Sequence, residues 1–177
     1  KWNGLDGELT LRRAMAMWRD AGSDDNFYDS AGVGESVLTA WAGMGRRNEC
    51  PKGMRLTAWN GGMSVINPDE RIDPRNQRAP KNKDHYANLK AQAWFSLRAR
   101  FENAYKKKMG REYDATHIIS LPSDLPYLEQ LQDELCQPHK KESGTGKVLV
   151  DKQPDGAQSP NLADAVVMAF FPLSAKA

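Results

Sequence analysis

The sequence predicts an α/β fold organised around a parallel sheet, and three observations lead to this class. Segments with the apolar period of a helix alternate along the chain with short apolar segments typical of strands, an order that indicates βαβ units. Hydrophobic residues make up 40% and charged residues 27% of the chain, as in ordinary globular domains. A length of 177 residues favours one domain with a core of its own.

The first third of the chain predicts two helices and two strands. Residues 8–21 carry apolar side chains at helical spacing, and Gly22 is a suitable stop. Residues 26–29 predict a short strand, residues 35–44 a helix and residues 54–59 a second strand. This order is that of a βαβ unit, in which the two strands lie parallel.

The middle of the chain predicts a long exposed loop followed by the longest helix. Residues 67–83 are rich in Pro, Asn and Arg, and so long an irregular segment within a domain is usually functional or disordered. Residues 84–107 place apolar side chains on one helical face. Lys90 falls within that face, either as a stem that packs while its ammonium reaches solvent or as a cation held near an acid or a phosphate.

The last third predicts two further strands and two further helices. Residues 117–121 and 147–151 have the apolar pattern of strands, and residues 125–136 that of a helix. The final helix follows Ser159 and Pro160, which suit the N-cap and the first helical position.

Asp164 is the only charged side chain between Leu162 and Phe171, in a helix that is apolar on every side. Such a helix is usually buried, where an ionised carboxylate is costly unless it meets a cation, a metal or several donors. If the helix begins at Asn161, Asp164 instead serves the helix N-terminus. From the residues alone, the capping role and a functional role stay open.

Asp29 ends the predicted strand at 26–29 and precedes a glycine-rich turn into a helix. In open α/β sheets, ligands bind at the carboxyl ends of strands, so this is a favourable place for a functional carboxylate. An Asp here is also a common turn or cap residue. The turn, which contains Val33 and Gly34, lacks the spacing of a dinucleotide-binding loop, and a nucleotide-binding enzyme that uses this turn is one alternative hypothesis.

The charge and the cysteine content of the chain limit the classes of binding partner and indicate the redox compartment. The net charge of +2 says little, yet the segment from Arg71 to Arg111 holds twelve basic residues against three acidic ones. This excess suits a nucleic-acid backbone and is also common on solvated faces. The two cysteines have no metal-ligand spacing, which favours a reducing compartment. No apolar run is long enough to span a bilayer, and we expect no signal peptide.

Several short segments together resemble one protein family. In chain order they are YDSAGVG at 28–34, NGG at 60–62, YANLKAQAWF at 86–95, IISLPSD at 118–124, KVLVDK at 147–152 and SPNLADA at 159–165. The family is the C-terminal nuclease domain of the large terminase subunit of tailed bacteriophages. The resemblance covers nearly the whole chain and is densest after Asp84.

This resemblance implies an RNase H-like fold, a mixed sheet flanked by helices, in a single nuclease-type domain over residues 1–177. It also implies a metal-dependent endonuclease that cuts concatemeric double-stranded DNA during viral packaging by two-metal hydrolysis of phosphodiester bonds. Carried over by position, Asp29 and Asp164 are the catalytic acids that hold Mg²⁺ or Mn²⁺. The resemblance therefore favours the functional role of Asp164.

The resemblance and the basic segment also imply partners. We expect five side chains to bind the DNA: Arg75, Arg78, Lys81, Lys83 and Lys90. The further partners implied are the portal and the small terminase subunit of the packaging motor. The implied location is the host bacterial cytoplasm, without a membrane partner.

The sequence departs from the family in three respects. The first catalytic Asp of the family lies on a first strand, and we expect this chain to begin after that strand, because Asp6 in its turn is a poor substitute. Asn161 stands where many relatives carry Asp. We expect no ATPase domain. A second hypothesis is therefore a non-catalytic DNA-binding or packaging-assembly module that keeps the fold with an incomplete set of acids.

Overall fold

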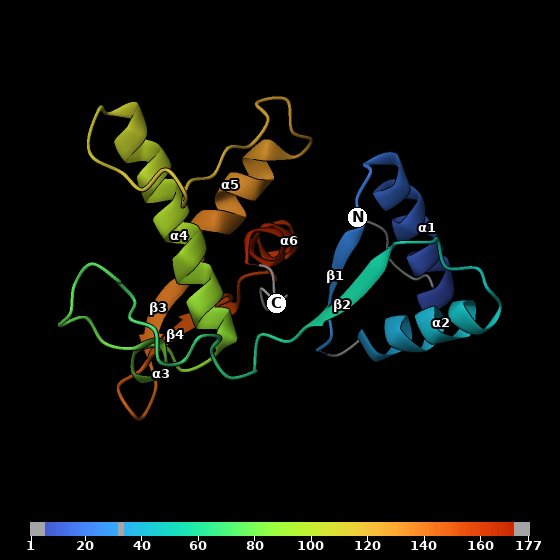
Figure 1. The fold of residues 1–177 in the computed structure, drawn as a ribbon, viewed down its shortest axis with the longest axis horizontal. Coiled ribbons are helices and arrows are strands. Elements are labelled where there is room, and N and C mark those ends of the chain that lie inside the picture. The colour runs from blue at the N-terminus through green and yellow to red at the C-terminus, as the bar shows by residue number, and fades with distance from the viewer. Residues whose placement is uncertain (1–5, 32–33, 172–177) are drawn as a thin grey trace. The chain divides into compact units, whose positions relative to one another are not determined.

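The computed structural model describes residues 6–31 and 34–171. The chain divides into two compact units, Lys1–Gly61 and Gly62–Ala177. Each unit contains its own helices and its own two-stranded sheet (Figure 1). The single nuclease-type domain expected over the whole chain stays a prediction.

The first unit is a βαβ arrangement with one additional helix. Its elements are α1 (Gly7–Asp20), β1 (Asp25–Asp29), α2 (Gly34–Arg46) and β2 (Arg55–Trp59). The two strands run parallel, with Asp29 opposite Trp59. The elements predicted for this region and their parallel pairing are confirmed.

The ends and the apolar face of α1 follow from its sequence. Asp6 is the N-cap, and its Oδ1 accepts the Leu9 N–H at 2.8 Å. Gly22, with a φ of 66°, follows the end of the helix. The core side chains Leu11 and Met15 pack with Met44 of α2. The helical period therefore identified the buried face of α1.

The second unit is a helical group with one antiparallel hairpin. Its elements are α3 (Asn82–His85), α4 (Leu89–Lys108), α5 (Leu128–Cys136), β3 (His139–Glu142), β4 (Val148–Asp151), the 3₁₀ turn η1 (Pro154–Gly156) and α6 (Asn161–Phe170). Both β4 and α6 pack against α4, and α5 packs against α6 (Figure 1). No helix among the described residues has the length and apolar character needed to cross a membrane.

The strand predicted at residues 117–121 is wrong, because the structure has no strand there. Side chains of α4 bind this segment in place of a neighbouring strand. Asn103 Nδ2 donates to the His117 carbonyl at 2.9 Å, and Arg100 Nη1 donates to the Ile118 carbonyl at 3.2 Å. Because ladder partners are replaced by side-chain donors, the apolar pattern alone was misleading.

Two predicted helices begin later than expected. The helix predicted from residue 84 begins at Leu89, because Asn88 caps it by accepting the Ala91 N–H at 3.0 Å. The helix predicted from residue 125 begins at Leu128, after Tyr127 in the left-handed region with a φ of 63°. Local capping and backbone conformation, rather than the apolar period, set both starts.

Candidate active site

Asp164 lies at the start of α6, and its carboxylate is half-buried. The carbonyl of Pro160, the N-cap, accepts the Asp164 N–H at 2.8 Å, so the helix begins one residue later than predicted. The Asp164 Oδ2 forms a short ion pair with Lys152 Nζ. The side chains of Lys152 and Asp164 are only 21% and 20% exposed. The cation that a shielded carboxylate requires is therefore present.

Glu134 of α5, rather than Asp164, accepts the free N–H groups of α6. Its Oε2 accepts the N–H of Leu162 at 2.6 Å and the N–H of Ala163 at 3.1 Å. Its Oε1 accepts Gln130 Nε2 at 2.8 Å. Pro160 has no side-chain acceptor for these groups, so α6 depends on a carboxylate from another helix. Asp164 is the acid of the first turn of α6, where it favours the helix dipole, but its side chain forms no capping hydrogen bond.

Gln137 fixes the connection between β4 and α6. Its Nε2 donates to the carbonyl of Lys152 at one end of this connection and to the carbonyl of Gln158, at 2.8 Å, at the other. The residue directly follows α5. Together with Glu134 it ties the C-terminal half of α5 to the segment that leads to Asp164. We call Glu134, Gln137, Lys152 and Asp164 the α6 corner.

Asp29 is the last residue of β1 and is exposed. Its Oδ1 accepts the Ala31 N–H at 2.9 Å, as in an Asx turn. Gly34 begins α2 directly against this turn, since a Cβ on Gly34 would lie 2.3 Å from the Asp29 backbone oxygen. Only glycine permits that approach. The end of the strand is thus fixed by backbone packing, and the carboxylate stays at the surface.

The two acids belong to different units, and their separation in space stays a prediction. Among residues 6–31 and 34–171, no three side chains of His, Cys, Asp or Glu gather in an arrangement for a metal ion. The DNA-binding role predicted for five basic side chains is likewise not tested by the geometry.

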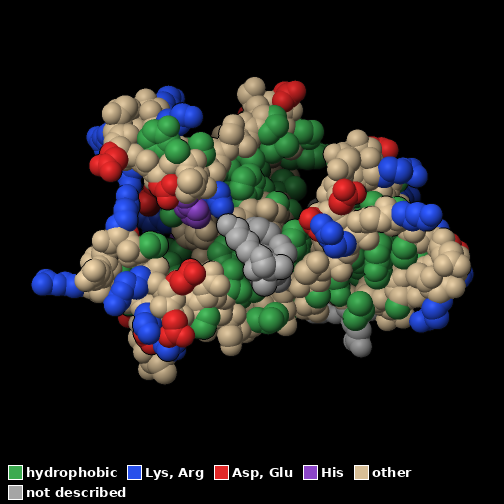
Figure 2. Space-filling view, in the orientation of Figure 1, with side chains coloured by type: hydrophobic (Ala, Val, Ile, Leu, Met, Phe, Trp, Pro, Cys, Tyr) green, Lys and Arg blue, Asp and Glu red, His purple; other side chains and the backbone are tan. Residues whose placement is uncertain are grey.

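Residues 67–83, here named the basic loop, are ordered by their own hydrogen bonds. Arg71 and Lys81 form an isolated antiparallel bridge, and Asn82 Nδ2 donates to the Asn67 carbonyl at 3.0 Å. Gln92 of α4 anchors the segment preceding the loop by binding both the N–H and the carbonyl of Ile66. Lys and Arg side chains stand out over this part of the molecule, with acids between them (Figure 2).

Two of the predicted DNA-binding lysines already have an acidic partner. Asp69 Oδ1 lies 3.0 Å from Lys81 Nζ and 2.8 Å from Lys83 Nζ. These lysines lower the pKa of Asp69 from 3.8 to about 2, so the carboxylate is ionised at neutral pH. Arg75 contacts Asp73 at 3.4 Å, a weak exposed pair. Much of the charge predicted for DNA is therefore balanced within the loop.

Lys90 lies in the first turn of α4 and is half-buried. Leu89 and Ala91 on either side of it are fully buried. Within the described part of the chain, the Lys90 side chain forms no hydrogen bond or ion pair. Both interpretations, a packed stem with a solvated ammonium and a cation for a phosphate, are compatible with this position.

Solved structures match the chain over most of its length, whereas no protein-family model and no curated protein sequence does. The nuclease domain of the large terminase subunit gp2 of bacterial virus Sf6 is 27% identical, with a TM-score of 0.73, over 92% of this chain and 71% of that chain. A point mutant of that domain with manganese gives 25% identity and a TM-score of 0.76 over 92% and 72%. A mutant of gp2c of the large terminase subunit from bacteriophage Sf6, with calcium, gives 28% identity and a TM-score of 0.73.

These matches place the chain in the class of mixed α/β domains with an RNase H-like fold, and the predicted fold class is confirmed. More narrowly, the chain is similar in structure to the nuclease domain of a phage large terminase subunit, the family that its sequence segments resemble.

The residues of the α6 corner and of β1 suit a divalent ion in their chemistry. Asp29 is an exposed carboxylate at the carboxyl end of a parallel strand, and carboxylate oxygens are the ligands that Mg²⁺ and Mn²⁺ prefer. Asp164 is a partly accessible carboxylate whose Oδ2 is engaged by Lys152. A metal ion at Asp164 has to share or displace this ammonium.

Sequence reasoning missed three of the four residues of the α6 corner. Glu134 had a detectable signal, because it lies three residues after Leu131 on the apolar face of its helix, as Asp164 lies in an apolar helix. Gln137 and Lys152 had none, since both act through polar contacts with residues remote in sequence.

Proposed function

We propose that the chain is the metal-dependent endonuclease domain of a viral DNA-packaging terminase, which cuts concatemeric double-stranded DNA by two-metal phosphodiester hydrolysis. The observation that carries this proposal is the match, over 92% of the chain, to a terminase nuclease domain that has been crystallised with manganese. The presence of Asp29 at a strand end and Asp164 at a helix start agrees with it.

In this proposal, Asp29 and Asp164 hold the ions, and Glu134 is a positioning residue. Bound Mg²⁺ or Mn²⁺ supplies an activated water and stabilises the leaving oxygen. Glu134 fixes the first turn of α6 and therefore the direction of the Asp164 side chain. Lys152 occupies the Asp164 Oδ2 through their ion pair, so its ammonium competes with an ion for this oxygen.

The partners follow from the same proposal. The basic loop and Lys90 contact the phosphate backbone without reading sequence, through Arg75, Arg78, Lys81 and Lys83. The domain acts in the host bacterial cytoplasm, together with the portal and the small terminase subunit.

The test is nicking of supercoiled plasmid in Mn²⁺. We expect cleavage that EDTA abolishes, and a loss of at least about a hundredfold in Asp164→Asn and in Asp29→Asn, since even residues behind metal ligands matter by about ten- to a hundredfold. Asp133→Asn is the matched control, because Asp133 is an exposed acid of α5. Cleavage that survives both site variants would refute the assignment of the two acids.

A non-catalytic DNA-binding or packaging-assembly module is the second candidate, favoured by the Lys152 ion pair that occupies one oxygen of Asp164. Salt-sensitive binding of duplex DNA without cleavage in Mn²⁺ would support this module instead.

A further inference from the structure

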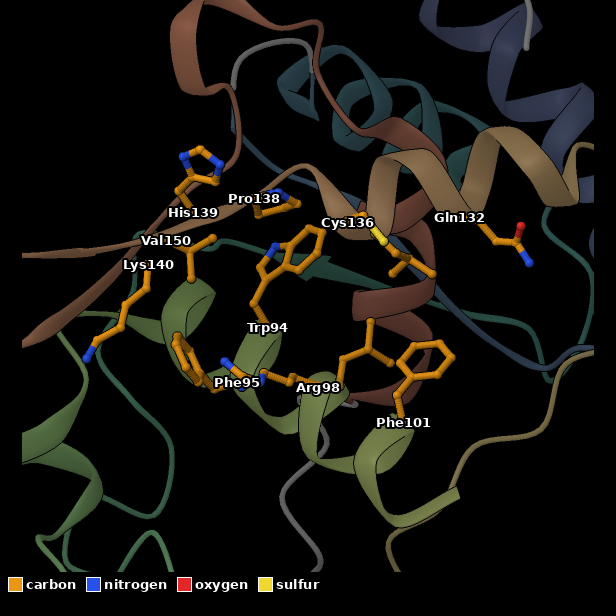
Figure 3. A pocket seen from close by; sticks show the side chains of 12 residues that line it. Trp94, Phe95, Arg98, Phe101, Gln132, Cys136, Pro138, His139, Lys140 and Val150 are labelled. Atoms are coloured by element: carbon orange, nitrogen blue, oxygen red, sulfur yellow. The ribbon is translucent and has the colours of Figure 1, made fainter. Parts of the chain in front are cut away.

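The second unit contains a cavity that the proposed cleavage chemistry does not use. Its volume is about 420 Å³, within the usual range for ligand pockets. Its apolar lining comes from α4 (Trp94, Phe95 and Phe101), from α5 (Leu135) and from β4 (Val150), as Figure 3 shows in part. Aromatic side chains at a concave surface are typical of the centres of binding sites.

The indole of Trp94 supplies a hydrogen-bond donor without an acceptor. Trp94 is 7% exposed, and its ring extends from α4 into the space beside Val150 and Cys136 (Figure 3). Its Nε1–H is buried and has no hydrogen-bond partner in the described residues. A buried donor of this kind is costly, and an acceptor on a bound molecule would satisfy it.

Basic side chains line part of the cavity. Arg98, His139 and Lys140 line it, and no Asp or Glu is among the described residues that do. The partners of Arg98 and Lys140 are weak, because the Arg98 pair with Glu102 is exposed and Lys140 Nζ lies 4.0 Å from Glu142. A ligand that matches this lining has a large apolar group next to a carboxylate.

An open strand edge lies beside the cavity. Among the described residues β3 pairs only with β4, and each of its residues is exposed. Ser143 N–H donates to the Lys147 carbonyl at 2.8 Å, and alternation along the antiparallel ladder then points the amides of Lys140 and Glu142 away from β4. Such an edge accepts an extended peptide, whereas its lysines disfavour a second copy of the same strand.

We propose that the cavity and the β3 edge together dock an acidic segment of a protein partner. The segment extends β3, inserts one large apolar side chain beside Trp94, and brings a carboxylate to the Trp94 Nε1–H and the basic side chains around it. This site is independent of the acids assigned to cleavage.

The test compares two fluorescein-labelled peptides of about ten residues that share a central Phe and differ in having Glu or Lys flanks. We expect the Glu peptide to bind at least about tenfold more tightly by anisotropy. Trp94→Phe keeps an aromatic, though smaller, side chain and removes the donor, so it should reduce the ratio of the two affinities. Amide hydrogen exchange at Lys140 and Glu142 should slow on binding.

Matched variants locate the site. Cys136→Trp fills the cavity from an exposed position and should abolish binding, whereas Cys136→Ser should not. Lys140→Glu should weaken the Glu peptide at least about fivefold, and Lys108→Glu, the same charge change elsewhere, should leave it unchanged.

The proposal is overturned if the Glu peptide does not bind, if both peptides bind equally, or if binding survives Cys136→Trp. If duplex DNA competes with the peptide, and if Cys136→Trp and Lys140→Glu weaken DNA binding equally, this face binds nucleic acid. That result also overturns the proposal.

Discussion

The α6 corner and the basic loop hold their functional charges in opposite ways. In the corner, the Asp164 carboxylate is 20% exposed and is oriented by side chains twelve or more positions away in sequence. In the loop, the lysines are paired with Asp69 at the surface, and the backbone is held by a bridge between two residues of the loop itself. A substitution in the corner therefore alters geometry, whereas one in the loop alters mainly charge.

This difference indicates how each region carries its proposed role. A metal site needs its carboxylates within narrow limits of position, and the corner provides positioning through Glu134 and Gln137. Contact with a phosphate backbone needs positive potential rather than one geometry, and an exposed loop supplies it.

Among the variants that keep both Asp29 and Asp164, Glu134→Gln should have the largest effect on stability. It removes the charge that faces two N–H groups of α6, and hydrogen bonds to a charged group contribute about 1.5–3 kcal/mol. We expect a loss of about 1–3 kcal/mol in the free energy of unfolding in urea. Plasmid cleavage should fall further than the folded fraction explains.

Glu129→Gln provides the control, because Glu129 is exposed in the first turn of the same helix. Its free energy of unfolding should fall by no more than about 0.3–1 kcal/mol, the usual contribution of an exposed acid in a first helical turn. If Glu134→Gln behaves like Glu129→Gln in both measurements, the α6 corner does not position Asp164.

Lys152→Met should have an intermediate effect, on metal binding. The variant keeps an apolar stem and frees the Asp164 Oδ2, which a metal ion otherwise shares with the ammonium. We expect Mn²⁺ to bind about fivefold more tightly by calorimetry, the equivalent of about 1 kcal/mol for a partly exposed pair. Lys141→Met, which removes the partner of Asp151, should leave Mn²⁺ binding unchanged. Weaker binding in Lys152→Met would mean that Lys152 supports the ion.

The apolar period was sufficient to predict most elements. It found α1, α2 and α6 to within a few residues and paired β1 with β2 in parallel. Each of these segments has a pattern that its own residues complete, so local spacing and tertiary packing agree. Asp29 was recognisable because it ends the pattern of a strand, and Asp164 because it interrupts the apolar pattern of a helix.

The contacts that orient Asp164 could not be predicted from the sequence. Glu134 caps a helix that begins 27 positions later, at Asn161, and nothing in the spacing connects the two. The strand prediction at 117–121 failed for the same reason, since the Asn103 side chain, rather than a neighbouring strand, donates to the His117 carbonyl. Long-range polar contacts follow from the folded arrangement rather than from periodicity.

The basic loop is tested on DNA binding, where two changes should act in opposite directions. Neutralising Arg75, Arg78 and Lys81 together should weaken binding to all duplex sequences alike and reduce the slope of log K against log salt by up to about three units. Asp69→Asn removes the carboxylate shared by Lys81 and Lys83, whose pKa of about 2 keeps it ionised at neutral pH, so it should strengthen binding and steepen the slope. Anisotropy of a labelled duplex across a salt series measures both. Identical slopes in the wild type and the two variants would assign the loop to solvation alone, and Asp69→Asn binding more weakly would show that the carboxylate orders the lysines for DNA rather than competing with it.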